Sequence, residues 1–307
     1  MRTSFIETLC ALANEDERIW LLTGDLGYSV LESYARAFPN RYVNIGVAEQ
    51  NMAGIAAGLA RCGKIVFTYS IANFPTLRCL EQIRNDVCYH EGDVKIVAVG
   101  GGFTYGAQGY THHGVEDLAI MRALPNMTVV APGDPVETRL ATRAIASRPG
   151  PCYLRLGKAN EPVVHKLVPA FTIGKAIQLR DGRDVTLIST GGMLQETMDV
   201  AKRLAPNGIE ARVLSMHTVK PVDVEAIIKA ARETGAVVTV EEHRLTGGLG
   251  TAVADVLAQA LARLPRFCKF GVPDEIYHAI GSQAYMKRLA GDLFETVQAL
   301  LRQRLAA

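Results

Sequence analysis

The chain has 307 residues, of which 49% are hydrophobic and 21% are charged, the profile of a globular protein with about two domains. Its formal net charge of +2, without a cluster of Lys or Arg, gives no electrostatic support for binding nucleic acid or an anionic membrane. No apolar run approaches the ~20 residues that span a bilayer, and the N-terminal residues lack a signal-peptide pattern, so we expect a cytoplasmic protein.

Short runs rich in Val and Ile alternate with helical patterns along the first half of the chain. The expected strands are Arg18–Thr23, Lys64–Ser70, Val94–Gly100, Met127–Ala131 and Cys152–Leu156. Helices are expected at Glu49–Arg61, where apolar residues share one face, and at Asp134–Ser147, which opens with an Asp-Pro start signal. We interpret residues 1–160 as one domain.

Residues 161–174 contain two prolines and no clear period, and they are interpreted as a linker. The alternation then restarts in residues 175–307, the expected second domain. Its expected elements are strand Asp184–Thr190, helix Met193–Ala205, strand Ile209–Met216, helix Val222–Thr234, strand Ala236–Glu241, helix Leu249–Leu264 and helix Ala284–Arg304. Strands that alternate with helices predict parallel sheets covered on both faces. The predicted fold class is α/β, with two doubly wound domains in tandem.

Several common sites of chemistry are missing from the sequence. There is no GxxxxGK[ST], GxSxG or HExxH motif, and the Gly-rich run at 100–106 lacks the third glycine of a dinucleotide-binding turn. The six cysteines form no CxxC pair, and most lie in apolar runs. They are expected to be buried thiols rather than disulfides, metal ligands or nucleophiles.

Polar residues gather in three segments where an α/β domain would place a binding crevice. Glu49 opens an apolar, Gly-rich helix, a position where an acid can also simply balance the helix dipole. An aromatic strand and loop, residues 67–74, follows, and such a segment is often core. The third segment, residues 109–118, reads GYTHHGVEDL, in which one histidine could serve as a cap.

The order of these segments is what distinguishes the chain. GVAEQNM, an aromatic strand and loop, and THHGVEDLA resemble the pyrimidine-binding domain of transketolases, and the resemblance continues through PNMTVVAPGDPVET. VEEHRLTGGLG in the second half is similar to the C-terminal domain of that family. The resemblance therefore covers essentially the whole chain. It implies a thiamine diphosphate-dependent enzyme that transfers a two-carbon ketol unit from a ketose, free or phosphorylated, to an aldose.

The resemblance also implies roles for individual residues. Glu49 would hydrogen-bond N1′ of the cofactor's aminopyrimidine, a positioned acid for proton transfer, and Asp25 would lie at the cofactor. One or more of the aromatics Phe67, Tyr69 and Phe74 would hold the pyrimidine ring. His112 would face the hydroxyl groups of the substrate.

One part of the family pattern is absent. Thiamine diphosphate enzymes need a Gly-Asp-Gly segment with a later Asn to bind Mg²⁺ and the diphosphate, and this chain has only Gly24-Asp25-Leu26. That segment aligns instead with the opening of the pyrimidine domain. We therefore expect no metal ligands in this chain, and a partner subunit that carries the diphosphate and Mg²⁺ site. The implied assembly is an α2β2 heterotetramer that is inactive without the partner.

Substrate-facing positions depart from the family pattern. Arg2 and Ser29 match residues that face the phosphate of the substrate. Gln108 stands where many transketolases have an acid, Gly100 where some relatives have a phosphate-binding histidine, and Lys158 where they have an arginine. These departures weaken the expectation of a phosphorylated sugar as acceptor and favour an unusual sugar as substrate.

Two other functions remain open. One is the β subunit of a 2-oxoacid dehydrogenase decarboxylase, which shares this two-domain plan, and THHGVEDLA with Arg2 argues against it. Deoxyxylulose phosphate synthase is also related but is normally one long chain. The other is a non-catalytic partner subunit, against which the intact Glu49 and His112 argue.

Overall fold

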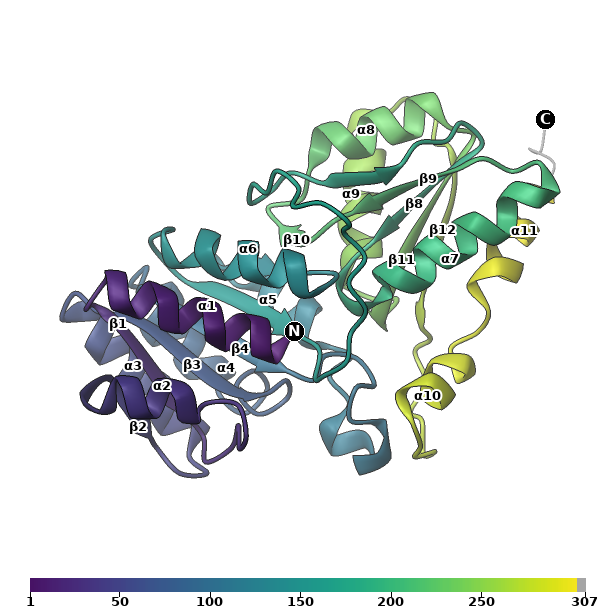
Figure 1. Cartoon of the computed structure of the whole chain (residues 1–307). Helices are drawn as coiled ribbons and strands as arrows, with labels where there is room; N and C mark the ends of the chain where they lie inside the picture. The colour runs from purple at the N-terminus through teal and green to yellow at the C-terminus, as the bar shows by residue number, and fades with distance from the viewer. Residues whose placement is uncertain (303–307) are drawn as a thin grey trace.

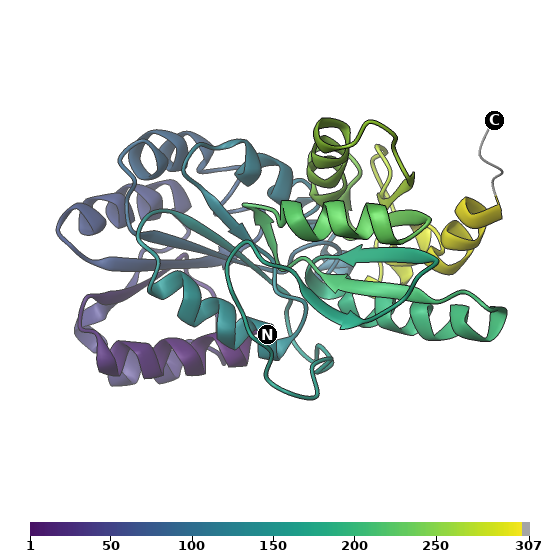
Figure 2. The same ribbon diagram turned by 90° about the horizontal axis from the view of Figure 1, so that it is seen from above.

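Two α/β domains lie side by side in the computed structural model, which describes residues 1–302 (Figures 1 and 2). The first is built on a seven-stranded sheet with the order β10-β5-β6-β4-β3-β1-β2. Its own strands are β1 (Ile19–Thr23), β2 (Tyr42–Asn44), β3 (Ile65–Ile71), β4 (Val94–Val99), β5 (Thr128–Val130) and β6 (Cys152–Leu156), all parallel. The predicted fold class is confirmed.

Helices cover both faces of this sheet (Figure 1). They are α1 (Arg2–Glu15), α2 (Glu32–Ala37) and α6 (Pro135–Ala146) on one face, and α3 (Glu49–Arg61), α4 (Leu80–Gln82), the π-helix η2 (Ile83–Cys88) and α5 (Asp117–Ala123) on the other. Short 3-10 turns are η1 (Pro39–Arg41), η3 (Gly106–Gln108) and η4 (Tyr110–His112).

Alternation along the strands decides which side chains meet which helices. Leu21 and Phe67 point toward α1 and α6, whereas their neighbours Leu22 and Val66 point toward α3 and α5. Side chains on a strand alternate between faces, so each strand supplies both cores. The same rule sends alternate residues at the end of β3 to opposite faces, which matters for the site.

The second domain has a five-stranded sheet with the order β12-β11-β8-β9-β7. Its strands are β7 (Ile177–Arg180), β8 (Val185–Ser189), β9 (Ala211–Ser215), β11 (Ala236–Arg244) and β12 (Arg266–Val272), and only β7, at one edge, is antiparallel. Its helices are η5 (Gly191–Met193), α7 (Leu194–Leu204), η6 (Ala205–Asn207), α8 (Val224–Glu233), α9 (Leu249–Ala260), α10 (Gln283–Leu289) and α11 (Leu293–Arg302).

One strand ties the two domains together. β10 (Thr218–Lys220) lies in the second half of the sequence, yet it pairs antiparallel with β5 at the edge of the first sheet. A single apolar core also runs from α3 and α5 of the first domain to α8 and α9 of the second. The sequence patterns predict neither feature, because both depend on contacts between distant segments.

The C-terminal helix and the cysteines differ from expectation. The single helix expected from Ala284 is wrong: it breaks into α10 and α11 at Gly291, whose φ is +122°, and Asp292 accepts backbone N–H bonds that start α11. Its expected last residues lie outside the described residues. All six cysteines are free thiols, but Cys62 is exposed rather than buried. Within residues 1–302, no helix is both long and apolar enough to cross a membrane.

Candidate active site

Three loops meet at the carboxyl edge of the first sheet. They follow β1, β3 and β4, which are parallel neighbours, so their ends lie at the same edge, where α/β domains bind ligands. The start of α3 lies at this edge as well. These loops carry half of the site residues that the sequence predicts, namely Asp25, Ser29, Phe74, Gln108 and His112.

Glu49 is the buried acid of this region. It is the first residue of α3 and its side chain is 1% exposed. Its Oε1 accepts a hydrogen bond from Ser70 Oγ at 3.2 Å, and its Oε2 accepts one from Arg78 Nη1 at 2.6 Å. A Cβ at Gly24 would lie 3.1 Å from Oε1, so the absent side chain leaves room for the carboxylate. A carboxylate this deeply buried needs such partners.

Phe74 links Glu49 to His112. The guanidinium of Arg78 lies over the Phe74 ring at 4.9 Å, in a cation–π contact. The same ring meets the His112 imidazole edge-on, with centroids 5.3 Å apart. The two predicted catalytic residues therefore lie at opposite ends of one contiguous group, Glu49–Arg78–Phe74–His112.

The other two aromatics point away from this group. Ser70 faces Glu49, so by strand alternation Phe67 and Tyr69 face α1 instead. Both are buried, and each lies 6.1 Å from the Phe5 ring. The structure thus brings Phe74 beside Glu49 and leaves Phe67 and Tyr69 on the other face of β3.

The loop after β1 holds Asp25 and Ser29 in left-handed backbone conformations, with φ of 56° and 62°. Asn44 donates to Asp25 Oδ1 at 2.9 Å, and the Ser29 N–H donates to Glu32 at 2.7 Å. Both side chains are exposed, and Asp25 lines a cavity of about 180 Å³.

Arg2 and Lys158 meet across a long sequence distance. Arg2 Nε donates to the Lys158 carbonyl at 2.6 Å, and the Lys158 ammonium lies 5.0 Å from the centre of the Tyr105 ring. Tyr105 packs so closely on Gly100, whose φ is +86°, that any Cβ there would overlap the ring. Tyr105 therefore fills the space that a side chain at position 100 would need.

Gln108 and His112 lie on the 3-10 turns that follow β4. Gln108 is exposed, and His112 is half-buried. Burial, helped by neighbouring His113, lowers the pKa of His112 below its usual range. The imidazole is therefore neutral at pH 7, able to donate one hydrogen bond and accept another.

The site fits one half of a cofactor. A buried carboxylate beside Phe74 suits a heteroaromatic ring that carries a hydrogen-bonding nitrogen. For a metal the donors do not converge: within residues 1–302, no three His, Cys, Asp or Glu side chains form a cluster that could hold an ion. The residues around Glu49 thus fit the pyrimidine ring of such a cofactor.

Two tandem α/β domains with a buried acid at the crevice define a class of thiamine diphosphate-type folds, and the comparisons specify the family. Residues 1–163 match the family described as "Transketolase, pyrimidine binding domain", and residues 174–288 match "Transketolase, C-terminal domain". The chain belongs to the transketolase family. The resemblance found in the sequence is confirmed.

Similar proteins include chains named as transketolase subunits. The chain is 43% identical to an apulose-4-phosphate transketolase subunit of Phocaeicola vulgatus, covering 89% of this chain and 88% of that protein. It is 40% identical to a 6-deoxy-6-sulfo-D-fructose transketolase subunit of Clostridium sp., covering 95% and 90%. A solved "Split gene transketolase, inactive beta4 tetramer" is 39% identical with a TM-score of 0.87, covering 98% and 96%. The chain thus consists of the pyrimidine-binding and C-terminal domains of the family, and it resembles the chain of a split-gene transketolase.

Two residues of the site were not predicted from the sequence. Arg78 follows Phe74 by four positions, and its basic side chain in an aromatic loop was the available signal. Tyr105 lies in the Gly-rich run, and only the folded loop shows that it covers Gly100.

Proposed function

We propose that this chain is the pyrimidine-binding subunit of a transketolase that is active only with a partner subunit, and that transfers a two-carbon ketol unit from a ketose to an aldose. The observation that carries the proposal is the buried Glu49 carboxylate, which contacts Arg78 and is linked through Arg78 and Phe74 to His112. Family membership supports the same reaction.

Each residue would have a defined task. Thiamine diphosphate, when bound, supplies the carbanion chemistry of ketol transfer. Glu49 would hold the proton shared with N1′ of the pyrimidine, Phe74 would cover the ring, and Asp25 would border the cofactor. Phe67 and Tyr69 lie on the other face of β3. They would support the strand beside the pyrimidine site and, contrary to what the resemblance implied, would not contact the ring itself.

The substrate would lie on the side of His112. Its neutral imidazole can both donate to and accept from sugar hydroxyls. We assign substrate contacts to Arg2, Ser29, Gln108 and Lys158 at the outer rim. The relatives' names include a sugar phosphate and a sulfosugar, and two basic side chains suit an anionic group of that kind.

The partner subunit would supply the Mg²⁺ and diphosphate ligands, in an α2β2 assembly with the cofactor between chains. We also propose the division into residues 1–160, a linker at 161–174, and residues 175–307, of which 303–307 lie outside the described residues. The family matches, which end at 163 and resume at 174, support this division.

The test is reconstitution with a chain of about 270 residues that carries Gly-Asp-Gly and a downstream Asn, a length that fits one or two domains. The pair should transfer ketol units between a ketose and an aldose, and this chain alone should not. Ketol transfer or tight thiamine diphosphate binding by this chain alone would contradict the two-subunit proposal. Oxidative decarboxylation of 2-oxoacids by the pair, with a lipoyl-bearing acyltransferase, would favour the dehydrogenase subunit instead.

A further inference from the structure

The loop that carries Gln108 and His112, residues 102–114, is closed at its base. Gly102 and Gly114 bond to each other in both directions, at 2.7 and 2.9 Å. Beyond this base the loop consists of 3-10 turns, whose internal hydrogen bonds are local. These turns fix the shape of the loop, and its position relative to the rest of the site depends on contacts with other segments.

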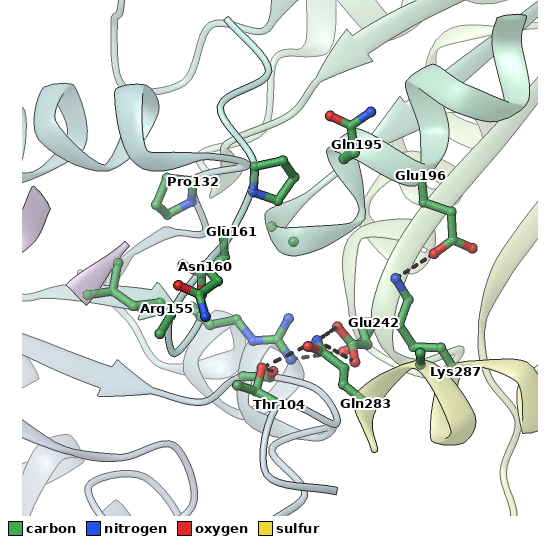
Figure 3. Close-up of a pocket in the computed structure, with 18 of the residues that line it drawn as sticks. Thr104, Pro132, Arg155, Asn160, Glu161, Gln195, Glu196, Glu242, Gln283 and Lys287 are labelled. Carbon is green, nitrogen blue, oxygen red and sulfur yellow. Dashed lines mark hydrogen bonds and ion pairs between the residues drawn. The ribbon is translucent and has the colours of Figure 1, made fainter. Parts of the chain in front are cut away.

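The second domain contacts the base of this loop through Glu242, at the end of β11. Glu242 Oε1 accepts a hydrogen bond from the Phe103 backbone N–H at 2.9 Å, and a Cβ at Gly102 would overlap the carboxylate. Gln283, the first residue of α10, donates to both oxygens of Glu242, at 3.1 and 2.9 Å, and to Thr104 at 3.4 Å. Figure 3 shows Gln283 between Thr104 and Glu242.

The same domain also contacts the outer part of the loop. The Gly281 N–H donates to the Gly106 carbonyl at 3.3 Å, and Met286, fully buried, packs where a side chain at Gly106 would be. On the side of the site, Asn73 Nδ2 donates to the Thr111 and His113 carbonyls of the loop, at 3.1 and 2.8 Å. The loop is therefore held between the site and α10, which lies below α7 and α11 in Figure 1 and is joined to α7 by the Lys287–Glu196 ion pair.

We infer that Glu242, Gln283 and Met286 of the second domain are positioning residues, which set where Gln108 and His112 meet the substrate. The inference rests on the proposed function, because it takes these two residues as substrate contacts. None of the three positioning residues belongs to the Glu49 group. Their loss should therefore affect sugar recognition while leaving cofactor activation by Glu49 intact.

The principal variant is Gln283→Leu, measured in the reconstituted pair. We expect kcat/KM for the aldose to fall about 10- to 100-fold, mostly through a higher KM, as for other small displacements of positioning groups. Hydrogen exchange at cofactor C2 should keep its wild-type rate. Gln195→Leu is the matched control, because Gln195 is also half-buried and lines, with Gln283, a cavity of about 430 Å³, but bonds to Asp199 on its own helix. It should behave as wild type.

A second variant disturbs the contact from the side of the loop. A Cβ at Gly106 would lie 2.7 Å from the Gly281 carbonyl and 2.8 Å from Met286 Cγ, so Gly106→Ala should also raise the KM for the aldose. Adding Met286→Ala should restore part of the loss. Neighbours in contact show such coupling, and unconnected residues do not.

A readout without catalysis separates this inference from the proposed function. His112 can be followed by NMR titration of the chain alone, its signal assigned with His112→Gln. In Gln283→Leu and Gly106→Ala its lowered pKa should move toward the ordinary value as the loop loosens. Unchanged KM and unchanged His112 titration in both variants would overturn the inference. A wild-type pair without ketol transfer would overturn the proposed function, and the titration would still decide the positioning role.

Discussion

The carboxylate of Glu49 is hydrogen-bonded to the guanidinium of Arg78 at 2.6 Å, although the Glu49 side chain is 1% exposed and the Arg78 side chain 45%. One long basic side chain thus reaches from the surface to a buried acid, and its ring contact with Phe74 orients it. The acid that we assign to the cofactor is therefore already paired in this chain.

Replacing Glu49 with Gln tests that assignment. The amide keeps the shape but cannot hold the proton shared with the pyrimidine, so hydrogen exchange at cofactor C2 in the reconstituted pair should slow by roughly 10²- to 10⁴-fold. Exchange can be followed by NMR of the cofactor after an acid quench. The control is Glu81→Gln, an exposed acid in the nearby α4. A wild-type exchange rate in Glu49→Gln would return Glu49 to a helix-terminus role.

Removing Arg78 should destabilise the chain more than its exposure suggests. Arg78→Met leaves the buried Glu49 carboxylate with Ser70 as its one remaining hydrogen-bond partner, which should cost about 1–3 kcal/mol of unfolding free energy. We take the lower end of that range, because solvent screens the half-exposed guanidinium. Urea unfolding of the chain alone measures this change.

A double variant isolates the pair. In Glu49→Gln with Arg78→Met no charge is buried, so the two losses should not add. If the two losses of unfolding free energy add strictly, Arg78 stabilises the chain through Phe74 or surface contacts, and not through the Glu49 carboxylate.

Glu49 could be predicted from sequence because it breaks a strong local pattern. A carboxylate at the start of an apolar helix is visible without any knowledge of the fold, and the alternation of strands and helices likewise fixes the fold class. Arg78 could not be found in the same way. Its partner is 29 residues away, and only the return of the chain after β3 brings the two together.

The aromatic loop and β10 likewise depend on contacts that local sequence patterns do not predict. Phe67, Tyr69 and Phe74 are equivalent by composition, and it is the alternation of faces at the end of β3 that separates them. β10 is a three-residue strand that pairs with the other domain, and a segment this short has no period of its own.

His217 should make the chain less stable in acid. Its ring stacks on Phe171 at 3.9 Å, and burial lowers its pKa to about 4, although the charge of Glu137 opposes the shift. The folded state thus resists a proton that the unfolded state accepts below about pH 6.5, so stability falls with pH from there toward pH 4.

The substitution His217→Phe keeps the stacking and removes the titration. Between about pH 7.5 and pH 5, wild type should lose about 2 kcal/mol more unfolding free energy than this variant, a value that follows from the lowered pKa. Urea unfolding at the two pH values gives the difference. Parallel pH profiles would mean that His217 takes up its proton at the same pH in the folded and the unfolded chain.

Gln108 should set substrate preference at the rim of the site. An ionised carboxylate at this position, as in many transketolases, only accepts hydrogen bonds, whereas the amide both donates and accepts. An unpaired polar group costs about 1–3 kcal/mol, enough to change relative kcat/KM by about one to two orders of magnitude. With Tyr105 over Gly100 and with Lys158 nearby, we expect Gln108 to disfavour ribose 5-phosphate. The measurement compares wild type and Gln108→Asp, in the reconstituted pair, on ribose 5-phosphate and on branched, deoxy and unphosphorylated aldoses. If wild type already prefers ribose 5-phosphate and Gln108→Asp leaves the ranking unchanged, Gln108 is a neutral replacement.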